Sequence, residues 1–141
     1  LDEPAAGLDV PARRNMLEQI LNIACEGDRT VLLSSHILSD LERVVDRVAI
    51  LDEGRLVAQG ELDQLKTSVR RIVFEGLVDR EELASSFQVL RISDNGRETQ
   101  AAVADFSRDR LNEFLTSRGD LRETKDYQLN LEDLFLEMTG N

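Results

Sequence analysis

The sequence has little of several features that direct a protein to a particular class. Cys25 is the only cysteine, so no internal disulfide is possible and a reducing compartment is the natural one. The apolar runs are far shorter than the roughly 20 residues that cross a bilayer, and no signal-peptide pattern is present. The 17 Lys and Arg residues form no long basic block, and 28 Asp and Glu give a net charge of −11. This charge repels phosphates, so we expect no nucleic acid partner.

The first half of the chain alternates helix and strand signals, and its 41% apolar content is sufficient for a core. A helix is predicted to begin at Asp9, an N-cap residue, with Pro11 in its first turn. Gly27-Asp28 is expected to end this helix, and Cys25 is expected to pack in it as a small hydrophobic residue. The apolar face has i, i+3, i+4, i+7 spacing and consists of Leu17, Ile20, Leu21 and Ala24.

A second helix and three strands are predicted to follow. Residues 30–35, TVLLSS, have the apolar pattern of a strand covered on both faces, as in parallel sheets. Ser39 and Glu42 have the spacing of a capping box for a short helix. RVAIL at 47–51 and LVAQ at 56–59 flank the turn DEGR and predict a hairpin. Together these elements predict half of a layered α/β sheet.

The pattern changes after residue 66, and we place a domain boundary near 66–70. Residues 70–141 read strand, helix, strand, strand, helix, strand and a closing helix. The β-α-β-β-α-β order predicts an α+β ferredoxin-like domain. Its phenylalanines are most simply core residues. The closing helix has Asn130 as N-cap, and its apolar stripe is expected to dock on the open sheet face, on the first domain or on another chain.

The motifs that indicate chemistry lie in the first 60 residues. Two adjacent carboxylates, Asp2 and Glu3, are followed by GLD at 7–9, and the strand predicted at 30–35 runs into His36. AILDEGRLVAQG follows at 49–60. An acidic pair alone is most often a solvated segment, and a lone histidine is most often structural. Their joint order and spacing favour a functional site.

These motifs resemble the C-terminal part of the ATP-binding cassette of ABC transporters, a P-loop NTPase sheet, over residues 1–66. In that family the Asp-Glu pair ends the Walker B strand, GLD is the D-loop and the histidine is the H-loop. Residues 70–141, ending LEDLFLEMTG, resemble the small domain appended to the cassettes of drug, antibiotic and ion exporters. The second resemblance depends on element order and one motif.

The resemblance implies a role for each motif residue. Asp2 would hold Mg²⁺, in part through water, because a hard cation prefers carboxylate oxygen. Glu3 would be the general base for the attacking water, since successive side chains at a strand end point to opposite sides. His36 would contact the γ-phosphate of ATP and hold the geometry of the water. Asp9 would complete the nucleotide-binding set at the interface with a second cassette.

The resemblance also implies a whole protein larger than these residues. No Gly is followed by Lys and no Gly-Gly pair occurs, so neither a P-loop nor the signature loop is present. We therefore expect the chain alone to be inactive and the parent to be an ATPase. The parent would pair with a second cassette beneath a membrane permease, at the inner face of the membrane in the cytoplasm. The alternatives are a non-catalytic dimerisation or regulatory module and an SMC or Rad50-type chromosome ATPase.

Overall fold

A computed structural model describes residues 1–26 and 29–140 of the chain. The chain divides into two compact units, Leu1–Val45 and Asp46–Asn141. In the residues that the structure describes, the first unit contains two helices and the second contains the sheets. The fold is therefore mixed α/β with antiparallel sheets. The predicted domain boundary near 66–70 stays a prediction.

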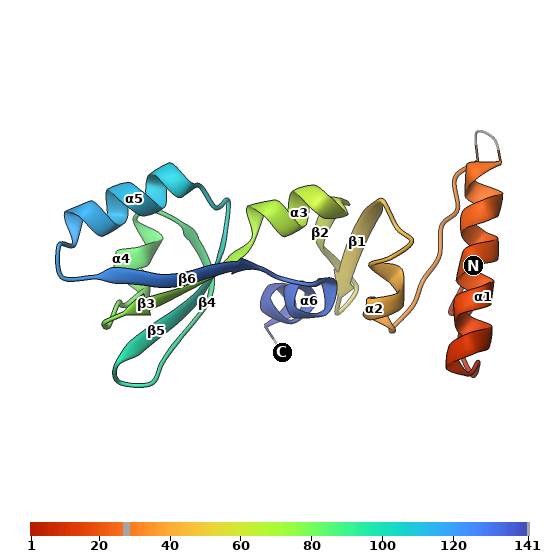
Figure 1. Cartoon of the computed structure of the whole chain (residues 1–141), viewed down its shortest axis with the longest axis horizontal. Helices are drawn as coiled ribbons and strands as arrows, with labels where there is room; N and C mark the ends of the chain where they lie inside the picture. The colour runs from red at the N-terminus through yellow and green to blue at the C-terminus, as the bar shows by residue number, and fades with distance from the viewer. Residues whose placement is uncertain (27–28, 141) are drawn as a thin grey trace. The chain divides into compact units, whose positions relative to one another are not determined.

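Helix α1 (Val10–Cys25) begins as the sequence predicted (Figure 1). The Asp9 carboxylate accepts a hydrogen bond from the Ala12 amide at 2.9 Å, which satisfies one of the free donors of the first turn. Leu17 and Ile20, on the predicted apolar face, are buried. Cys25 is exposed, so the prediction that it packs as a hydrophobic residue was wrong. The predicted stop at Gly27-Asp28 lies outside the described residues.

Residues 30–35 do not form a strand, which differs from the prediction. Among the described residues, backbone partners for this segment come from Leu1: its amino group donates to the Leu32 carbonyl at 2.7 Å, and its carbonyl accepts from the Ser34 amide at 2.9 Å. These bonds have the spacing of a parallel pair. One paired residue is too short a ladder for a strand, and Leu32 remains 85% exposed.

Helix α2 (Leu38–Leu41) begins one residue before the predicted cap. Ile37 is the N-cap residue and Ser39 lies inside the helix, so the predicted capping box was wrong. The chain is instead turned into the helix by Ser35, whose hydroxyl oxygen accepts from the Ile37 amide at 3.0 Å. This local bond from a serine side chain satisfies a backbone amide just before the helix.

The second unit begins with the predicted hairpin of β1 (Arg47–Asp52) and β2 (Arg55–Glu61). Glu53 and Gly54 form the turn with φ of 47° and 76°. Positive φ at both central residues is typical of the two-residue turn that matches strand twist. Helix α3 (Leu62–Ser68) then leads to the larger sheet.

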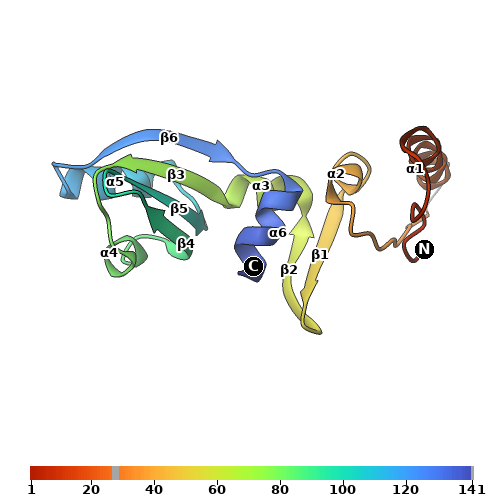
Figure 2. The ribbon, with the colours of Figure 1, turned by 90° about the horizontal axis from the view of Figure 1, so that it is seen from below.

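The larger sheet has four antiparallel strands in the order β4-β5-β3-β6 (Figures 1 and 2). Its strands are β3 (Arg70–Glu75), β4 (Gln88–Asp94), β5 (Glu98–Ala104) and β6 (Arg122–Gln128). The helices of this region are α4 (Arg80–Ala84), α5 (Arg108–Ser117) and α6 (Leu131–Thr139). The element order agrees with the sequence prediction. The assignment to the ferredoxin-like fold stays a prediction.

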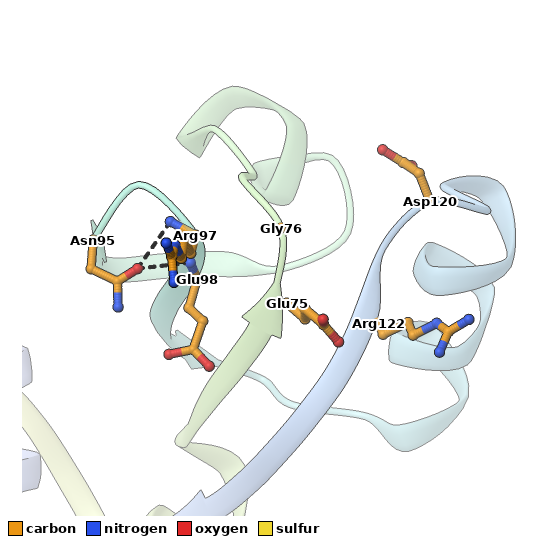
Figure 3. A pocket seen from close by; sticks show the side chains of 7 residues that line it. All are labelled: Glu75, Gly76, Asn95, Arg97, Glu98, Asp120 and Arg122. Atoms are coloured by element: carbon orange, nitrogen blue, oxygen red, sulfur yellow. Dashed lines mark hydrogen bonds between the residues drawn. The ribbon is translucent and has the colours of Figure 1, made fainter.

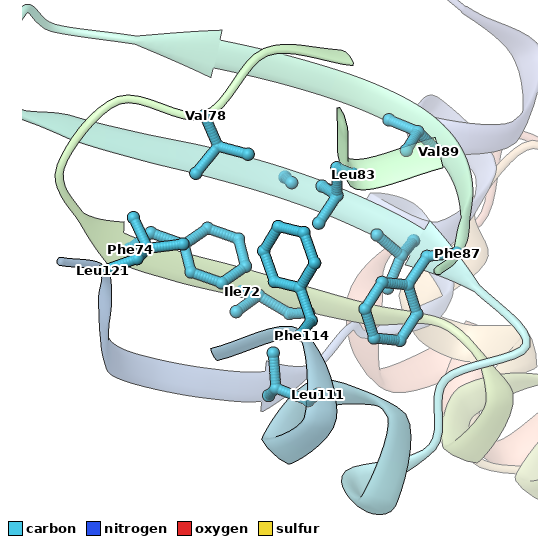
Figure 4. Packing of buried hydrophobic residues seen from close by; sticks show 11 residues of the cluster. Ile72, Phe74, Val78, Leu83, Phe87, Val89, Leu111, Phe114 and Leu121 are labelled. Carbon is cyan, nitrogen blue, oxygen red and sulfur yellow. The ribbon is translucent and has the colours of Figure 1, made fainter. Parts of the chain in front are cut away.

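The main core lies between one face of this sheet and helices α4 and α5 (Figure 4). Phe74 of β3 meets Phe114 of α5 edge to face, with ring centroids 6.1 Å apart. Phe87 is also buried, and Phe106 and Phe135 are partly buried against the two cores. The prediction that the phenylalanines are core residues is confirmed.

A second core holds helix α6. Leu134 is fully buried and clusters with Ile50 of the hairpin and with Val69 and Leu129 at the strand ends. The stripe of α6 therefore docks within its own chain, on the hairpin, which the sequence analysis placed in the first domain, and on the strand ends of the larger sheet. Glu137 is bound by Arg71 of β3, and its Oε2 lies 3.3 Å from Nε of Arg91 on β4. None of the helices in the described residues has the length and apolar character to cross a membrane.

Candidate functional site

The candidate site begins with the tight turn that follows the two carboxylates. The Glu3 carbonyl accepts from the Ala6 amide at 3.0 Å, and the Ala5 carbonyl accepts from the Leu8 amide at 3.2 Å. Gly7 has φ of 76°, a conformation that glycine adopts without a Cβ clash. The turn reverses the chain directly after Asp2 and Glu3, so both carboxylates stand at the rim of the unit.

Glu3 itself has φ of 42°, in the left-handed region that side chains disfavour. This conformation costs roughly 1–2 kcal/mol for a residue with a Cβ. Backbone strain of this kind persists only where surrounding bonds hold it, and it occurs often at functional sites. Here the Glu3 amide donates to the Ser34 hydroxyl oxygen at 3.1 Å, while its carbonyl holds the turn.

The segment that carries His36 lies beside the carboxylates because its backbone pairs with Leu1. Ser34 and His36 are two residues apart, and each side chain contacts one of the two carboxylates. The Glu3 carboxylate Oε2 lies 2.8 Å from His36 Nδ1. The Ser34 hydroxyl donates to Asp2 Oδ1 at 2.5 Å. The structure thus brings together three of the four predicted site residues.

The contact between Glu3 and His36 defines the roles of the ring nitrogens. An ionised carboxylate only accepts, so Nδ1 is the donor in this contact and Nε2 is the other nitrogen, available to a ligand. The His36 side chain is 73% exposed and the Glu3 side chain 37% exposed. Both groups can therefore be reached by a water molecule or a phosphate.

Asp9 does not join this group in the described residues. Its carboxylate Oδ1 accepts from the Ala12 amide, so it serves the N-terminus of α1. Asp9 is nevertheless exposed, and it follows the same turn as the two carboxylates. Its role toward a nucleotide stays a prediction.

Asp2 has the chemistry that Mg²⁺ requires. This ion takes oxygen ligands, keeps several waters and is usually bound by one or two carboxylates together with substrate phosphates. Asp2 is exposed, and one of its oxygens accepts from Ser34. Within residues 1–26 and 29–140, no group of three or more His, Cys, Asp or Glu residues forms a cage for a metal ion. A single carboxylate that acts partly through water fits this arrangement.

Ser34 is the site residue that the sequence analysis did not select. In sequence it is one of the two serines of the TVLLSS segment that precedes the histidine. The signal that could have found it is the alternation of the strand predicted at 30–35: if His36 faces the carboxylates, Ser34, two residues before it, faces them too. A hydroxyl both donates and accepts, which suits a position between a carboxylate and a backbone amide.

A separate hollow of about 790 Å³ lies at the end of the larger sheet (Figure 3). Asn95 accepts there from the amides of Arg97 and Glu98 at 3.0 and 2.8 Å, so its side-chain oxygen is used by the β4–β5 turn. The side chains of Asp120 and Arg122 point apart (Figure 3). This hollow contains none of the predicted site residues.

The chain is similar over its full length to ATP-binding proteins of bacterial transport systems. It is 34% identical over 146 residues to the Nod factor export ATP-binding protein I of Neorhizobium galegae, covering 99% of the chain and 40% of that relative. It is 31% identical over 146 residues to the bacitracin transport ATP-binding protein BcrA of Bacillus licheniformis, covering 99% of the chain and 48% of the relative.

A third relative is the daunorubicin/doxorubicin resistance ATP-binding protein DrrA of Streptomyces peucetius, 29% identical over 160 residues, with 100% of the chain and 46% of the relative covered. No protein-family model matches the chain. The chain belongs to the ATP-binding proteins of ABC transporters and corresponds to the C-terminal part of the cassette. It spans less than half of the length of these relatives.

Proposed function

We propose that this chain supplies the hydrolytic carboxylates of the ATP site in an ABC exporter. The observation that carries the proposal is the 2.8 Å contact between Glu3 Oε2 and His36 Nδ1, beside the hydrogen bond from Ser34 to Asp2. ATP hydrolysis needs a group to orient the attacking water and oxygen ligands for a metal ion. The Glu3–His36 pair would orient the water, and Asp2 would supply the oxygen ligand.

Each residue has a distinct task in this proposal. Glu3 accepts the proton of the attacking water, with Oε1 as the oxygen that its contact with His36 does not use. His36 holds the Glu3 carboxylate through Nδ1 and presents Nε2 toward the γ-phosphate. Asp2 would hold Mg²⁺, in part through water. The metal, when bound, neutralises charge on the phosphate oxygens.

The names of the relatives support an exporter as the parent. Two are described by what they move, Nod factor and bacitracin, and a third by drug resistance. We propose ATP and Mg²⁺ as ligands, a membrane permease and a second cassette as partners, and the inner face of the cell membrane as the location. Asp9, at the rim after the turn, would face the second cassette.

A test of the proposal is Glu3→Gln in the full-length protein reconstituted with its permease. The amide keeps the shape but cannot accept a proton, so kcat for ATP hydrolysis should fall by about 10²–10⁴-fold. Binding of Mg-ATP should be retained, because the phosphate contacts do not depend on this proton transfer. Steady-state hydrolysis and retention of radiolabelled ATP measure the two effects.

Glu18→Gln is the matched control, because Glu18 is an exposed glutamate of α1. It should leave both measurements unchanged. Hydrolysis near the wild-type rate in Glu3→Gln would exclude Glu3 as the base and make His36 the better candidate. Loss of both binding and turnover would indicate a folding defect, which a melting curve of the variant would detect.

A further inference from the structure

We propose that Ser34 is a positioning residue for both carboxylates of the site. This inference rests on the proposed function. One hydroxyl contacts the two neighbouring residues with different roles: it donates to Asp2 Oδ1 at 2.5 Å and accepts from the Glu3 amide at 3.1 Å. Ser34 would therefore set the orientation of the metal-binding carboxylate and the backbone conformation of the catalytic one.

The hydrogen bond from Ser34 to Asp2 is stronger than one between two neutral groups. A hydroxyl that donates to a carboxylate forms a charge-assisted hydrogen bond, typically 2.5–2.7 Å long, and these are roughly twice as strong as neutral ones. It holds Oδ1, so Oδ2 is the oxygen that remains for a metal-bound water. Groups that hold a ligating carboxylate in this way orient it and raise metal affinity.

The contact to Glu3 stabilises an unfavourable backbone conformation. The residue has φ of 42°, and its amide finds an acceptor in the Ser34 hydroxyl. Without that acceptor the amide would have to bind water, and the strained conformation would lose one of its restraints. The Glu3 side chain would then leave the position from which it contacts His36 at 2.8 Å.

Removal of the hydroxyl should spare the local fold. The segment is held beside Leu1 by main-chain bonds, from the Ser34 amide to the Leu1 carbonyl and from the Leu1 amino group to the Leu32 carbonyl. These bonds do not involve the serine side chain. Ser34 is also exposed, so Ser34→Ala leaves no cavity.

The chain provides a matched control in the next residue. Ser35 has the same side chain, but its hydroxyl oxygen accepts from the Ile37 amide at 3.0 Å and has no hydrogen bond to either carboxylate in the described residues. Ser35→Ala removes a hydroxyl one position away that contacts neither carboxylate, and the bond that it loses is the one to the Ile37 amide. Ser34→Thr retains a hydroxyl at the site and is the rescue variant.

The experiment uses the full-length protein with its permease and measures metal binding apart from turnover. Mn²⁺ replaces Mg²⁺, because both ions take carboxylate and water oxygens, and its binding is measured by electron paramagnetic resonance with ATP present. The measurement is made on the Glu3→Gln background, where ATP should persist. Ser34→Ala should weaken Mn²⁺ binding by about 10–100-fold.

In the otherwise unmodified protein, Ser34→Ala should lower kcat by about 10–100-fold, with Ser34→Thr closer to wild type and Ser35→Ala unchanged. Unchanged Mn²⁺ affinity in Ser34→Ala would overturn the inference, and so would equal losses in Ser34→Ala and Ser35→Ala. The outcome for Ser34 is separable from the proposed function. If Glu3→Gln abolishes turnover and Ser34→Ala does not affect metal binding, only the positioning role fails.

Discussion

At the scale of single residues, Asp126 on β6 shows how charge is held inside the second unit. Arg70 Nε donates to its Oδ2 at 3.0 Å, and Arg108 Nη2 donates to its Oδ1 at 2.5 Å. Burial by itself would raise the pKa of Asp126, but the hydrogen bonds from the two arginines outweigh it and hold this pKa below its ordinary value of 3.8. The charged form is therefore favoured by folding.

This pKa direction predicts an acid dependence of stability. Because the pKa of Asp126 is lower in the folded chain than in the unfolded one, its contribution is complete above the unfolded value and is lost as the pH falls through the folded value. Asp126→Asn should reduce the free energy of unfolding at pH 7 by about 1–3 kcal/mol and make stability fall less steeply below about pH 4. Urea unfolding between pH 2.5 and pH 7 measures both effects.

Glu113→Gln is the control for Asp126→Asn, because it removes an exposed carboxylate of α5. Surface changes of this kind usually alter stability by less than about 0.5 kcal/mol. A pH profile of Asp126→Asn that runs parallel to that of the wild-type chain would show that this carboxylate does not contribute to the acid dependence.

The residues of the candidate site could be predicted only where their chemistry is unusual in sequence. Asp2, Glu3 and His36 were found because an acidic pair and a histidine stood at recognisable spacings, and the structure places Glu3 against His36. Ser34 was missed because a serine is common, and its importance depends on a contact between segments 32 residues apart. Cys25 was misjudged because helical spacing does not say which face is covered.

At the scale of elements, helix α6 joins the hairpin to the larger sheet. Leu134 is fully buried in a cluster with Ile50 and Leu129, whereas Leu136 in the same helix is 40% exposed. Leu134→Ala should lower the free energy of unfolding of the chain by about 2–5 kcal/mol, because it removes apolar contacts and leaves a cavity. Chemical denaturation followed by circular dichroism measures the loss.

Leu136→Ala makes the same chemical change on the exposed side of α6. It should cost well under half as much, because a partly exposed side chain loses little burial. Equal losses for the two variants would contradict the docking of α6 through its Leu134 side.

The elements of residues 70–140 were predictable because their signals are local. Asp79 and Asn130 accept from the amides that begin α4 and α6, and the turn at Asn95 joins β4 to β5. The segment at 30–35 was predicted as a strand on composition, but a strand also requires neighbours along its backbone. Its bonds to Leu1 supply only one paired residue, and local sequence does not encode that partner.

At the scale of the whole molecule, the net charge of −11 and the two carboxylates of the site both oppose the binding of an anionic nucleotide. Asp2 and Glu3 are negative groups and ATP is an anion, so they do not attract it directly. Binding of ATP beside them requires a metal ion and cationic or amide donors for the phosphates. In P-loop proteins most of those donors belong to the loop G-x-x-x-x-G-K-[ST]. No Gly in these 141 residues is followed by Lys.

We therefore expect the 141-residue chain by itself to show no measurable binding of Mg-ATP at millimolar nucleotide and no hydrolysis above background. The site would hold its carboxylates in place, as the backbone bonds between Leu1 and the 30–35 segment do here, but would lack the donors that bind phosphate. Isothermal titration calorimetry of the chain, with the full-length protein as the positive control, measures the difference. Micromolar affinity in the chain alone would contradict this prediction. It would also show that the phosphate contacts come from residues within this sequence.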